Sequence, residues 1–385
     1  MDSYIPYGRQ SINEADIAAV VRVLQSDWLT QGPMIECFEN AVAQAAGAKY
    51  AVALSSATAG LHLACLALGI GPGDRVWTSP NTFVASANCA MYCGAAIDFV
   101  DIDRYTRNIS IEALEQKLAQ AELMGTLPTL LIPVHFAGLS CDMAAIAQLA
   151  QRYGFRVLED AAHAIGASYQ DQPVGGCHYS QATVFSFHPV KIVTTGEGGV
   201  ITTNDEAFYR RLLRLRSHGI TRNPDEMTQT SEGDWYYQQL ELGFNYRMTD
   251  LQAALGVNQI SRLKEFCSLR RDKVQYYLQK LPKDLIQLPK YSVESAWHLF
   301  CINLRNEKER KRVFDAMRLR GIGVNVHYLP VHLQPFYRNQ GFNEGDFPCA
   351  ESYYRSAITL PLFADLSLCN QDYVIQSLLE VLEIE

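Results

Sequence analysis

A lysine in the middle of the chain has a setting in which lysine is seldom found. Lys191 follows an apolar run, residues 183–185, and precedes a turn rich in threonine and glycine that leads into a second apolar run, residues 199–201. A lysine in such a sheltered position is usually paired or used chemically. Shielding from water favours the neutral amine, and only the neutral amine attacks an aldehyde to form an imine. We therefore predict that Lys191 forms a Schiff base.

An acidic residue lies upstream, at the end of another apolar run. Residues 155–158 are followed by Glu159 and Asp160. Doubly wound α/β sheets bind ligands beyond the carboxyl ends of their strands, although a helix N-cap is the ordinary alternative for such an aspartate. A Schiff-base lysine and a strand-end aspartate are the two groups that pyridoxal 5'-phosphate needs from a protein. We therefore predict this coenzyme, with Asp160 keeping its pyridine nitrogen protonated.

Other residues near predicted strand ends could complete such a site. Residues 55–60 form a small-residue turn between a predicted strand and a predicted helix, where free backbone N–H groups and the helix dipole suit a phosphate. Ser186 could give this phosphate a hydroxyl, Phe83 could stack on a flat ring, and His163 could contact the ring hydroxyl. Each has an ordinary structural alternative, but together, in this order, they favour the coenzyme.

The overall composition is that of an ordinary globular protein. The 385 residues are 48% hydrophobic and 19% charged, and the net charge of −8 argues against binding to the nucleic-acid backbone. The ten cysteines include no CxxC pair, and Cys89 and Cys93 alone make a poor zinc site, so we expect reduced thiols and no metal. Residues 1–6 do not resemble a signal peptide and no apolar stretch is long enough for a membrane helix. We expect a cytoplasmic protein.

Short apolar runs alternate with helical patterns through the first part of the chain. This alternation indicates βαβ units and a mainly parallel sheet covered on both faces. The predicted strands are 50–54, 75–78, 97–100, 130–134 and 155–158, and the helices 61–66, 83–91, 111–120 and 143–151, with Ser110 capping the third helix.

The pattern changes after Asp160. Residues 183–187 and 199–201 are too close together for a helical crossover, so we expect two antiparallel strands. Residues 218–242 indicate a long surface loop, and a long helix is predicted from Thr249 to about residue 280. The segments 298–304, 308–320 and 324–328 indicate a smaller α+β unit. We place a large coenzyme-binding domain at 1–255 and a small domain at 256–385.

Several motifs resemble those of a known family. They are Leu29-Thr30-Gln31-Gly32-Pro33, Ser56-Ala57-Thr58-Ala59, Glu159-Asp160-Ala161-Ala162-His163, Phe185-Ser186-Phe187-His188 with Lys191, Gly196-Glu197-Gly198-Gly199, Arg216-Ser217-His218-Gly219, Gly243-Phe244-Asn245-Tyr246-Arg247 and Val326-His327-Tyr328. With them the chain resembles the sugar-nucleotide aminotransferases of the DegT/DnrJ/EryC1/StrS type, from Ile5 to about Leu362. The resemblance implies an α/β structure of the pyridoxal-phosphate-dependent transferase fold type I, like aspartate aminotransferase, with a large, mostly parallel-sheet domain and a small C-terminal α+β domain.

The resemblance also implies roles for individual residues. Lys191 would carry the coenzyme as a Schiff base, Asp160 would pair with its pyridinium nitrogen, and Phe83 would lie against its ring. The resemblance further implies a homodimer with active sites at the interface. The remaining roles are contacts to the coenzyme by Thr58, Ala59, His163 and Ser186, and by Asn245 from the partner subunit, and contacts to the substrate by Tyr7, Thr30, Arg247 and His327, the last across the interface.

Two departures from the common family pattern narrow the expected activity. The phosphate turn has Ala57-Thr58 where Gly-Thr is frequent, and His163 stands where glutamine is frequent. Both resemble the aminotransferases of pseudaminic acid biosynthesis, which share the Val-His-Tyr-x-Pro stretch. We expect transfer of the amine of L-glutamate to UDP-2-acetamido-2,6-dideoxy-β-L-arabino-hexos-4-ulose, giving its 4-amino derivative (EC 2.6.1.92) for flagellin or surface-polysaccharide glycosylation. The alternative is another 4-keto sugar nucleotide, of the lipid A pentose, perosamine or bacillosamine type.

Three rival functions make different predictions. A sugar dehydratase of the same fold typically lacks the Schiff-base lysine, whereas Lys191 is present. A sugar-nucleotide sensor without coenzyme would not need lysine, aspartate and serine together. A nicotinamide oxidoreductase would open its first βα unit with GxGxxG, where this chain has residues 55–60.

Overall fold

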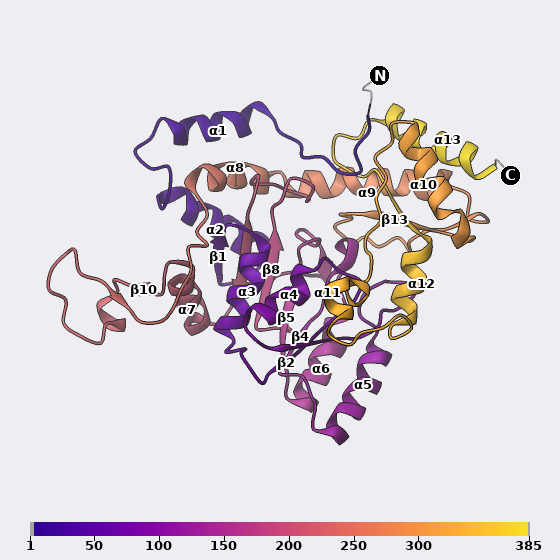
Figure 1. Cartoon of the computed structure of the whole chain (residues 1–385). Coiled ribbons are helices and arrows are strands. Elements are labelled where there is room, and N and C mark those ends of the chain that lie inside the picture. The colour runs from indigo at the N-terminus through magenta and orange to yellow at the C-terminus, as the bar shows by residue number, and fades with distance from the viewer. Residues whose placement is uncertain (1–3, 384–385) are drawn as a thin grey trace.

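The computed structural model describes residues 4–383, in which helices cover both faces of one large sheet and a second, smaller sheet lies toward the C-terminus (Figure 1). The large sheet has seven strands in the order β1-β9-β8-β5-β4-β2-β3, and only β9 runs against its neighbours. The predictions of a mainly parallel sheet and of an antiparallel β8–β9 pair are confirmed. The strands are β1 (Tyr50–Leu54), β2 (Arg75–Thr78), β3 (Ala96–Phe99), β4 (Leu130–Ile132), β5 (Arg156–Asp160), β8 (Ala182–Ser186) and β9 (Gly199–Thr203).

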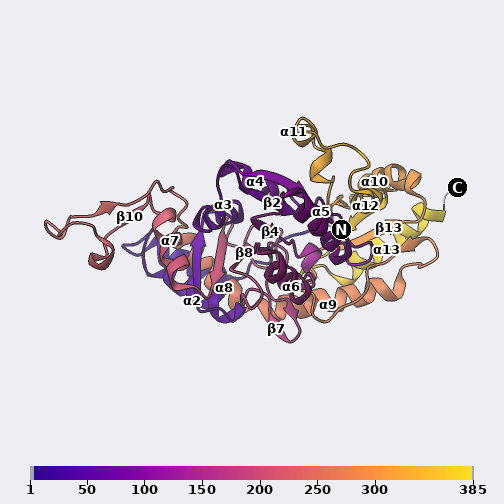
Figure 2. The ribbon, with the colours of Figure 1, turned by 90° about the horizontal axis from the view of Figure 1, so that it is seen from below.

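Alternate residues of each strand pack against different helices. Val52 of β1 belongs to the core beneath α3, α4 and α7, whereas its neighbour Ala53 packs with α2 and α8. This alternation is the period of two that a sheet buried on both faces imposes (Figure 2). One face carries α3 (Ala57–Ala67), α4 (Ala85–Tyr92) and α7 (Glu206–Arg216), and the other carries α2 (Pro33–Ala46), α5 (Ile111–Met124), α6 (Met143–Tyr153) and α8 (Asp250–Ser261).

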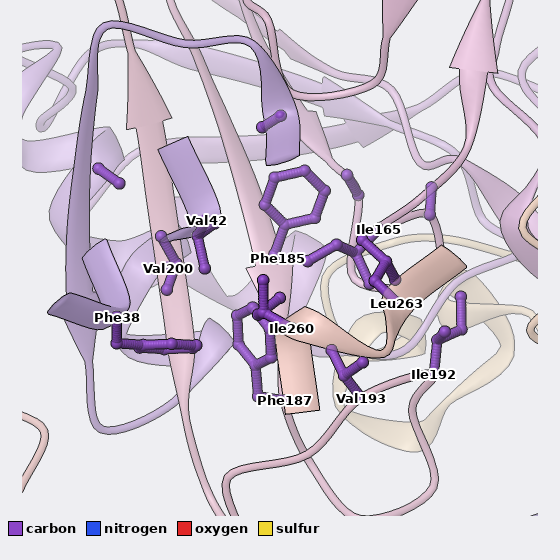
Figure 3. Close-up of a cluster of buried hydrophobic side chains, with 14 of the residues drawn as sticks. Phe38, Val42, Ile165, Phe185, Phe187, Ile192, Val193, Val200, Ile260 and Leu263 are labelled. Carbon is purple, nitrogen blue, oxygen red and sulfur yellow. The ribbon is translucent and has the colours of Figure 1, made fainter. Parts of the chain in front are cut away.

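The core between the sheet and α2 is closely packed (Figure 3). The rings of Phe38 and Phe187 meet edge to face with centroids 5.1 Å apart. Gly256 of α8 lies so close to this pair that a Cβ there would stand 2.5 Å from the Phe38 ring. Glycine therefore lets α8 approach α2, and this packing holds the residues after β8, including Ile192 and Val193, against the sheet.

The long helix predicted from Thr249 to residue 280 is two helices. Thr249 caps α8 by accepting a hydrogen bond from the backbone N–H of Gln252, so the predicted start of the helix is confirmed. The helix ends at Ser261, and α9 (Leu263–Lys280) starts after Arg262, whose φ of −97° and ψ of 5° depart from helical values. The break lets the chain leave the large sheet and cross to the small one. Since neither glycine nor proline marks it, the helical periodicity gave no sign of it.

The small sheet is antiparallel, with β12 (Ile286–Gln287), β13 (Phe300–Leu304) and β14 (Ala357–Leu360) covered by α10 (Arg310–Leu319) and α13 (Leu368–Glu383). The predicted third segment, 324–328, forms no strand and makes a single bridge, between Asn325 and Thr359. Ile5 pairs with Ile322, so the start of the described chain also packs on this unit. The division at 255/256 stays a prediction.

The predicted surface loop, 218–242, is an arm that projects from the body (Figures 1 and 2). A short hairpin, β10 (Ile220–Thr221) and β11 (Gln238–Gln239), and one 3-10 turn between its strands give it regular structure. Its side chains include the strongly exposed Trp235 and Leu242. The remaining elements are α1 (Glu14–Leu24), α11 (Pro335–Arg338), α12 (Pro348–Ser356), β6 (Ser168–Tyr169), β7 (Gln172–Pro173) and 3-10 turns at Phe136–Gly138, Pro224–Glu226, Glu307–Glu309 and Val331–Leu333.

Two absences concern the part of the chain that the structure describes. Between residues 4 and 383, no helix combines the length and the apolar character needed to cross a bilayer. Within the same range, no group of three or more histidine, cysteine, aspartate or glutamate residues is arranged to hold a metal ion.

Candidate active site

A cavity of ≈ 600 Å³ opens where the carboxyl ends of β1, β2, β5 and β8 meet the segment that precedes α11. Parallel strands deliver the residues that follow them to one edge of a sheet, which explains why segments distant in the sequence gather there. The predicted site residues that line the cavity are Tyr7, Thr58, Phe83, Asp160, His163, Ser186, Lys191 and His327.

Lys191 reaches the cavity from the turn after β8. Its backbone N–H donates to the carbonyl of His188 (2.9 Å), and Ile192 and Val193 beyond it are buried in the core. The side chain is partly exposed because it faces the cavity, yet protein atoms crowd around it. Burial lowers the pKa of the amine to about 8, against the opposing effect of the Asp160 carboxylate. A minor fraction of this lysine is therefore uncharged at neutral pH and a larger one at mildly alkaline pH, as nucleophilic attack requires.

Asp160 ends β5 and is buried on the cavity wall. Its Oδ2 accepts a hydrogen bond from the Ser86 hydroxyl (2.6 Å), and its Oδ1 accepts from the backbone N–H of Ala162 (3.0 Å). Ser86 in turn contacts the hydroxyl of Thr82 (2.7 Å). Turns rather than a helix follow Asp160, so the alternative of a helix N-cap is wrong. The carboxylate is thus held in a fixed orientation at the cavity.

The amino-terminal end of α3 provides a setting for a phosphate. Ser56 caps this helix by accepting from the N–H of Ala59 (3.1 Å), while Ala57 and Thr58 line the cavity. The Ala59 N–H is thus already engaged, and Ala59 itself does not line the cavity. A Cβ on Gly199 would stand 2.4 Å from the carbonyl carbon of Ser56, so glycine lets β9 pack against this turn.

Buried histidines surround the lysine. Burial lowers the pKa of His163 and of His298 well below the usual range, and that of His327 to about 3. All three are therefore uncharged at neutral pH. His327 accepts or donates a hydrogen bond at Thr359 Oγ1 (2.8 Å) and lines the cavity of its own chain. This differs from the expectation that it acts across an interface, because the bridge of Asn325 to Thr359 carries its segment to the same chain's cavity.

Three other predicted residues do not line this cavity. Thr30 and Asn245 are exposed, and Arg247 is partly exposed. They pair through the backbone with Thr249, Ser217 and Leu54, respectively, beside the outer edge of the large sheet. Any contact that these side chains make to a ligand must come from this outer edge.

The sequence predicted no individual role for some cavity residues, although Ala162 and Tyr328 lie within the motifs that resemble the family. Thr82 and Ser86 resemble ordinary residues around the start of a helix, and their hydroxyls meet because the turn before α4 brings Thr82 back to the first turn of the helix. Asn325 and Tyr328 lie in a segment distant from the strand ends, and Ala162 looks like a core residue. The place of each residue at the cavity becomes apparent only in the folded chain.

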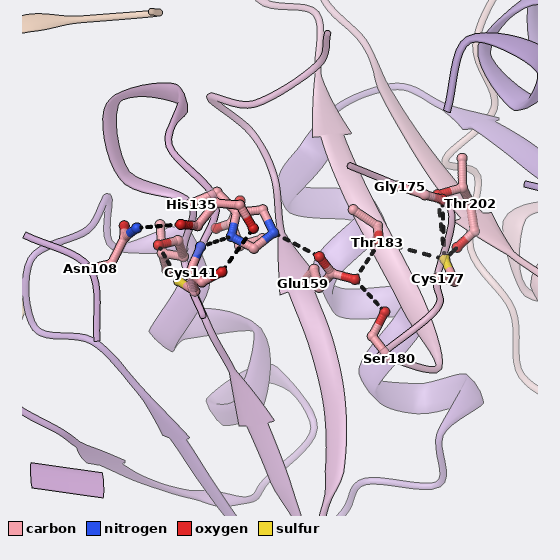
Figure 4. A network of polar contacts seen from close by, with 12 residues as sticks. Asn108, His135, Cys141, Glu159, Gly175, Cys177, Ser180, Thr183 and Thr202 are labelled. Atoms are coloured by element: carbon pink, nitrogen blue, oxygen red, sulfur yellow. Dashed lines mark hydrogen bonds and ion pairs between the residues drawn. The ribbon is translucent and has the colours of Figure 1, made fainter. Parts of the chain in front are cut away.

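A buried polar network supports the end of β5 from behind (Figure 4). The Glu159 carboxylate lies 2.7 Å from His135 Nε2 and also accepts from the hydroxyls of Ser180 and Thr183. Burial would raise the pKa of Glu159, but these hydrogen bonds outweigh it and lower the pKa. The backbone N–H of His135 donates to the Asp160 carbonyl (3.0 Å). The network therefore fixes the strand that presents Asp160.

The donor set fits pyridoxal phosphate. The coenzyme needs an amine for its aldehyde, a carboxylate for its pyridine nitrogen and donors for its phosphate. Lys191, Asp160, and the α3 terminus with Ser186 supply these groups around one cavity, and Phe83 and Ala162 add apolar walls.

Comparison with known proteins agrees with this chemistry. The model of the DegT/DnrJ/EryC1/StrS aminotransferase family matches residues 10–379. The chain is 38% identical to the spore coat polysaccharide biosynthesis protein SpsC of Bacillus subtilis, over 99% of this chain and 97% of SpsC. Among solved structures, PseC of Helicobacter pylori, an aminotransferase involved in the biosynthesis of pseudoaminic acid, superposes with a TM-score of 0.88 at 29% identity, covering 99% of each chain.

A further similar structure bears on the coenzyme. The structure of Spr1654 of Streptococcus pneumoniae, in its PLP form, has a TM-score of 0.89 at 31% identity over 99% of both chains, and this protein is also known in a PMP form. The fold is that of the type I pyridoxal-phosphate enzymes, and the cofactor is pyridoxal phosphate. The chain belongs to the DegT/DnrJ/EryC1/StrS aminotransferase family and is a sugar aminotransferase.

Proposed function

We propose that this sugar aminotransferase moves the amine of L-glutamate to C4 of UDP-2-acetamido-2,6-dideoxy-β-L-arabino-hexos-4-ulose, as pseudaminic acid biosynthesis requires. Two features support this substrate: the likeness to PseC over 99% of both chains, and the Val326-His327-Tyr328-x-Pro330 stretch at the cavity. The higher identity to SpsC favours the alternative of another 4-keto sugar nucleotide.

The observation that carries the aminotransfer chemistry is the meeting of Lys191 and Asp160 at one cavity. When bound, the coenzyme withdraws electrons from the carbon that bears the migrating amine. Asp160, fixed by Ser86 and Ala162, holds a proton at the pyridine nitrogen. Lys191, with its lowered pKa, takes a proton from the glutamate α-carbon and returns one at C4 of the acceptor.

The remaining predicted residues indicate how two subunits and the substrate would be arranged. We infer a cytoplasmic homodimer in which Asn245 of the partner subunit approaches the phosphate, since Asn245 lies at the outer edge of its own sheet. Tyr7 and His327 contact the sugar nucleotide within one chain, because both line the cavity. Thr30 and Arg247 act from outside that cavity.

The capture of coenzyme should depend on pH through Lys191. Because its pKa lies at about 8, the amine gains reactivity as the pH rises from 6.5 toward about 9 and loses it below, where the proton stays on nitrogen. Mixing coenzyme-free protein with pyridoxal phosphate and following the visible absorbance gives this rate. After correction for the titration of free coenzyme, a rate that stays flat across this range would contradict the lowered pKa.

A panel of 4-keto sugar nucleotides tests the substrate. Protein loaded with coenzyme is incubated with L-glutamate and UDP-, GDP- or dTDP-linked 4-keto sugars, and 2-oxoglutarate and the amino sugar are measured. We expect the highest kcat/KM for the UDP-linked N-acetylated 6-deoxy sugar. A higher value for a pentose or a GDP sugar would reject this substrate in favour of the alternative. Binding of these nucleotides without amination of any of them would support the sensor hypothesis instead.

A further inference from the structure

The hydrogen atoms of His163 can be placed from its neighbours. The backbone N–H of Ala137 donates to Nδ1 (3.3 Å), so this nitrogen carries a lone pair. The ring is uncharged because burial, together with Lys191 and His327, lowers its pKa. Its one proton therefore sits on Nε2, which lies 3.1 Å from the Tyr328 hydroxyl. Nε2–H donates to the phenol oxygen, and the phenol keeps its own hydrogen for another acceptor.

The donor to His163 is held rigidly. Ala137 has a φ of 56°, a conformation that non-glycine residues rarely adopt, and its carbonyl accepts from the N–H of His298 (2.9 Å). The next residue, Gly138, lies so close that a Cβ would stand 2.8 Å from the Trp297 nitrogen. The turn is thereby clamped against the segment that leads to β13, and its N–H points at His163.

Residues 4–383 offer no acceptor for the Tyr328 hydrogen. Among the hydrogen bonds of residues 4–383, His163 is the one partner of this hydroxyl. Tyr328 lines the cavity with Lys191 and Asp160. Burial raises the pKa of Tyr328 above that of an ordinary tyrosine, so the phenol stays protonated across the working range of the enzyme. A donor that faces a cavity and lacks an acceptor is costly once a ligand excludes water there, and a ligand oxygen in the cavity would satisfy it.

We propose that Tyr328 donates a hydrogen bond to an electron-rich sp2 oxygen of the bound reactants, and that His163 is the positioning residue that turns the phenol hydrogen toward the cavity. Two oxygens have this chemistry: the phenolic oxygen of the coenzyme and the C4 carbonyl oxygen of the keto sugar. The assignment differs from the direct contact of His163 to the coenzyme expected from the sequence. If the acceptor is the sugar carbonyl oxygen, the inference rests on the proposed function. If it is the coenzyme oxygen, the inference does not.

Tyr328→Phe removes the hydroxyl and keeps the ring. If the acceptor is on the coenzyme, the pH titration of the visible spectrum of the loaded variant shifts before any substrate is added. If it is on the sugar, this titration is unchanged, and the reaction of the aminated enzyme with keto sugar slows by about 10²-fold, as for loss of one preorganised donor. Tyr277→Phe is the matched control, because its buried hydroxyl donates to the Pro361 carbonyl (2.9 Å) in the small unit.

Variants of His163 test the positioning role. His163→Leu should reproduce the effect of Tyr328→Phe and add little to it in the double variant, because both remove one interaction. His163→Gln, whose amide can still donate at the Nε2 position, should keep much of the wild-type behaviour in both measurements. The thermal melting temperatures of the coenzyme-loaded variants show whether each variant is still folded. The proposal is overturned if Tyr328→Phe matches Tyr277→Phe in both measurements, or if the two losses are additive. If the wild type aminates no sugar, the proposed substrate is wrong. In that case, a coenzyme titration that is the same in Tyr328→Phe and in the wild type rejects the role of Tyr328.

Discussion

Replacement of Lys191 by alanine should lower kcat for aminotransfer by about 10⁴-fold, because one amine supplies both the covalent attachment and the proton transfer. The variant should still bind pyridoxal phosphate, since Thr58, Ser186 and Asp160 remain at the cavity. Single-turnover kinetics with glutamate measure the loss. Borohydride reduction followed by peptide mapping should label Lys191 in the wild-type protein and no lysine in the variant.

Lys264→Ala provides the control, because Lys264 is exposed on α9, away from the cavity. It should leave both the rate and the reduced label unchanged. A small primary amine added to Lys191→Ala should restore part of the proton transfer. Near-normal turnover by Lys191→Ala, or a label on another lysine, would remove Lys191 from the mechanism.

Asp160→Asn should lower kcat by about 10²- to 10⁴-fold, because the neutral amide no longer favours a protonated pyridine nitrogen. The substitution keeps the shape of the side chain, so Ser86 can still donate to the remaining oxygen. The expected loss lies in the removal of the α-proton of glutamate. A primary deuterium isotope effect on that step should therefore become larger or newly visible in the variant.

The matched control for this substitution is Asp171→Asn. Asp171 is exposed and has a φ of 62°, a conformation that asparagine adopts as readily as aspartate. Its kinetics should equal those of the wild type. Unchanged kinetics for Asp160→Asn, with normal coenzyme occupancy, would show that this carboxylate does not control the pyridine nitrogen.

The strand ends were predictable from the sequence because the alternation of apolar runs and helical patterns is visible in short segments, yet it determines that the strands lie parallel in one sheet. The runs before Ser56, Asp160 and Ser186 read as strands, and parallel strands must bring their carboxyl ends to one edge. The turn into the antiparallel β9 was predictable from its short spacing. These features place Lys191 and Asp160 together without knowledge of the packing.

The contributions of nonlocal packing could not be predicted in this way. Tyr328 enters the cavity because Asn325 pairs with Thr359, and no periodicity reports such a single bridge. Ser86 becomes a partner of Asp160 only through the crossing of α4 over the sheet. The break at Arg262 follows from the positions of two separate cores. In each case the residue type is ordinary, and the tertiary contact alone gives it a role.

The place of β9 within the large sheet has a consequence for synthesis on the ribosome. Tyr50 and Leu54 of β1 pair with Thr203 and Gly199, so the partner of this early strand is translated about 150 residues later. Until then β1 lacks the strand that it pairs with in the sheet, and the nascent chain needs shielding from other strands. The backbone turn at Ser56 gains its packing contact with Gly199 at the same moment. A nascent chain should thus acquire phosphate affinity abruptly, once the segment after Thr203 has left the exit tunnel.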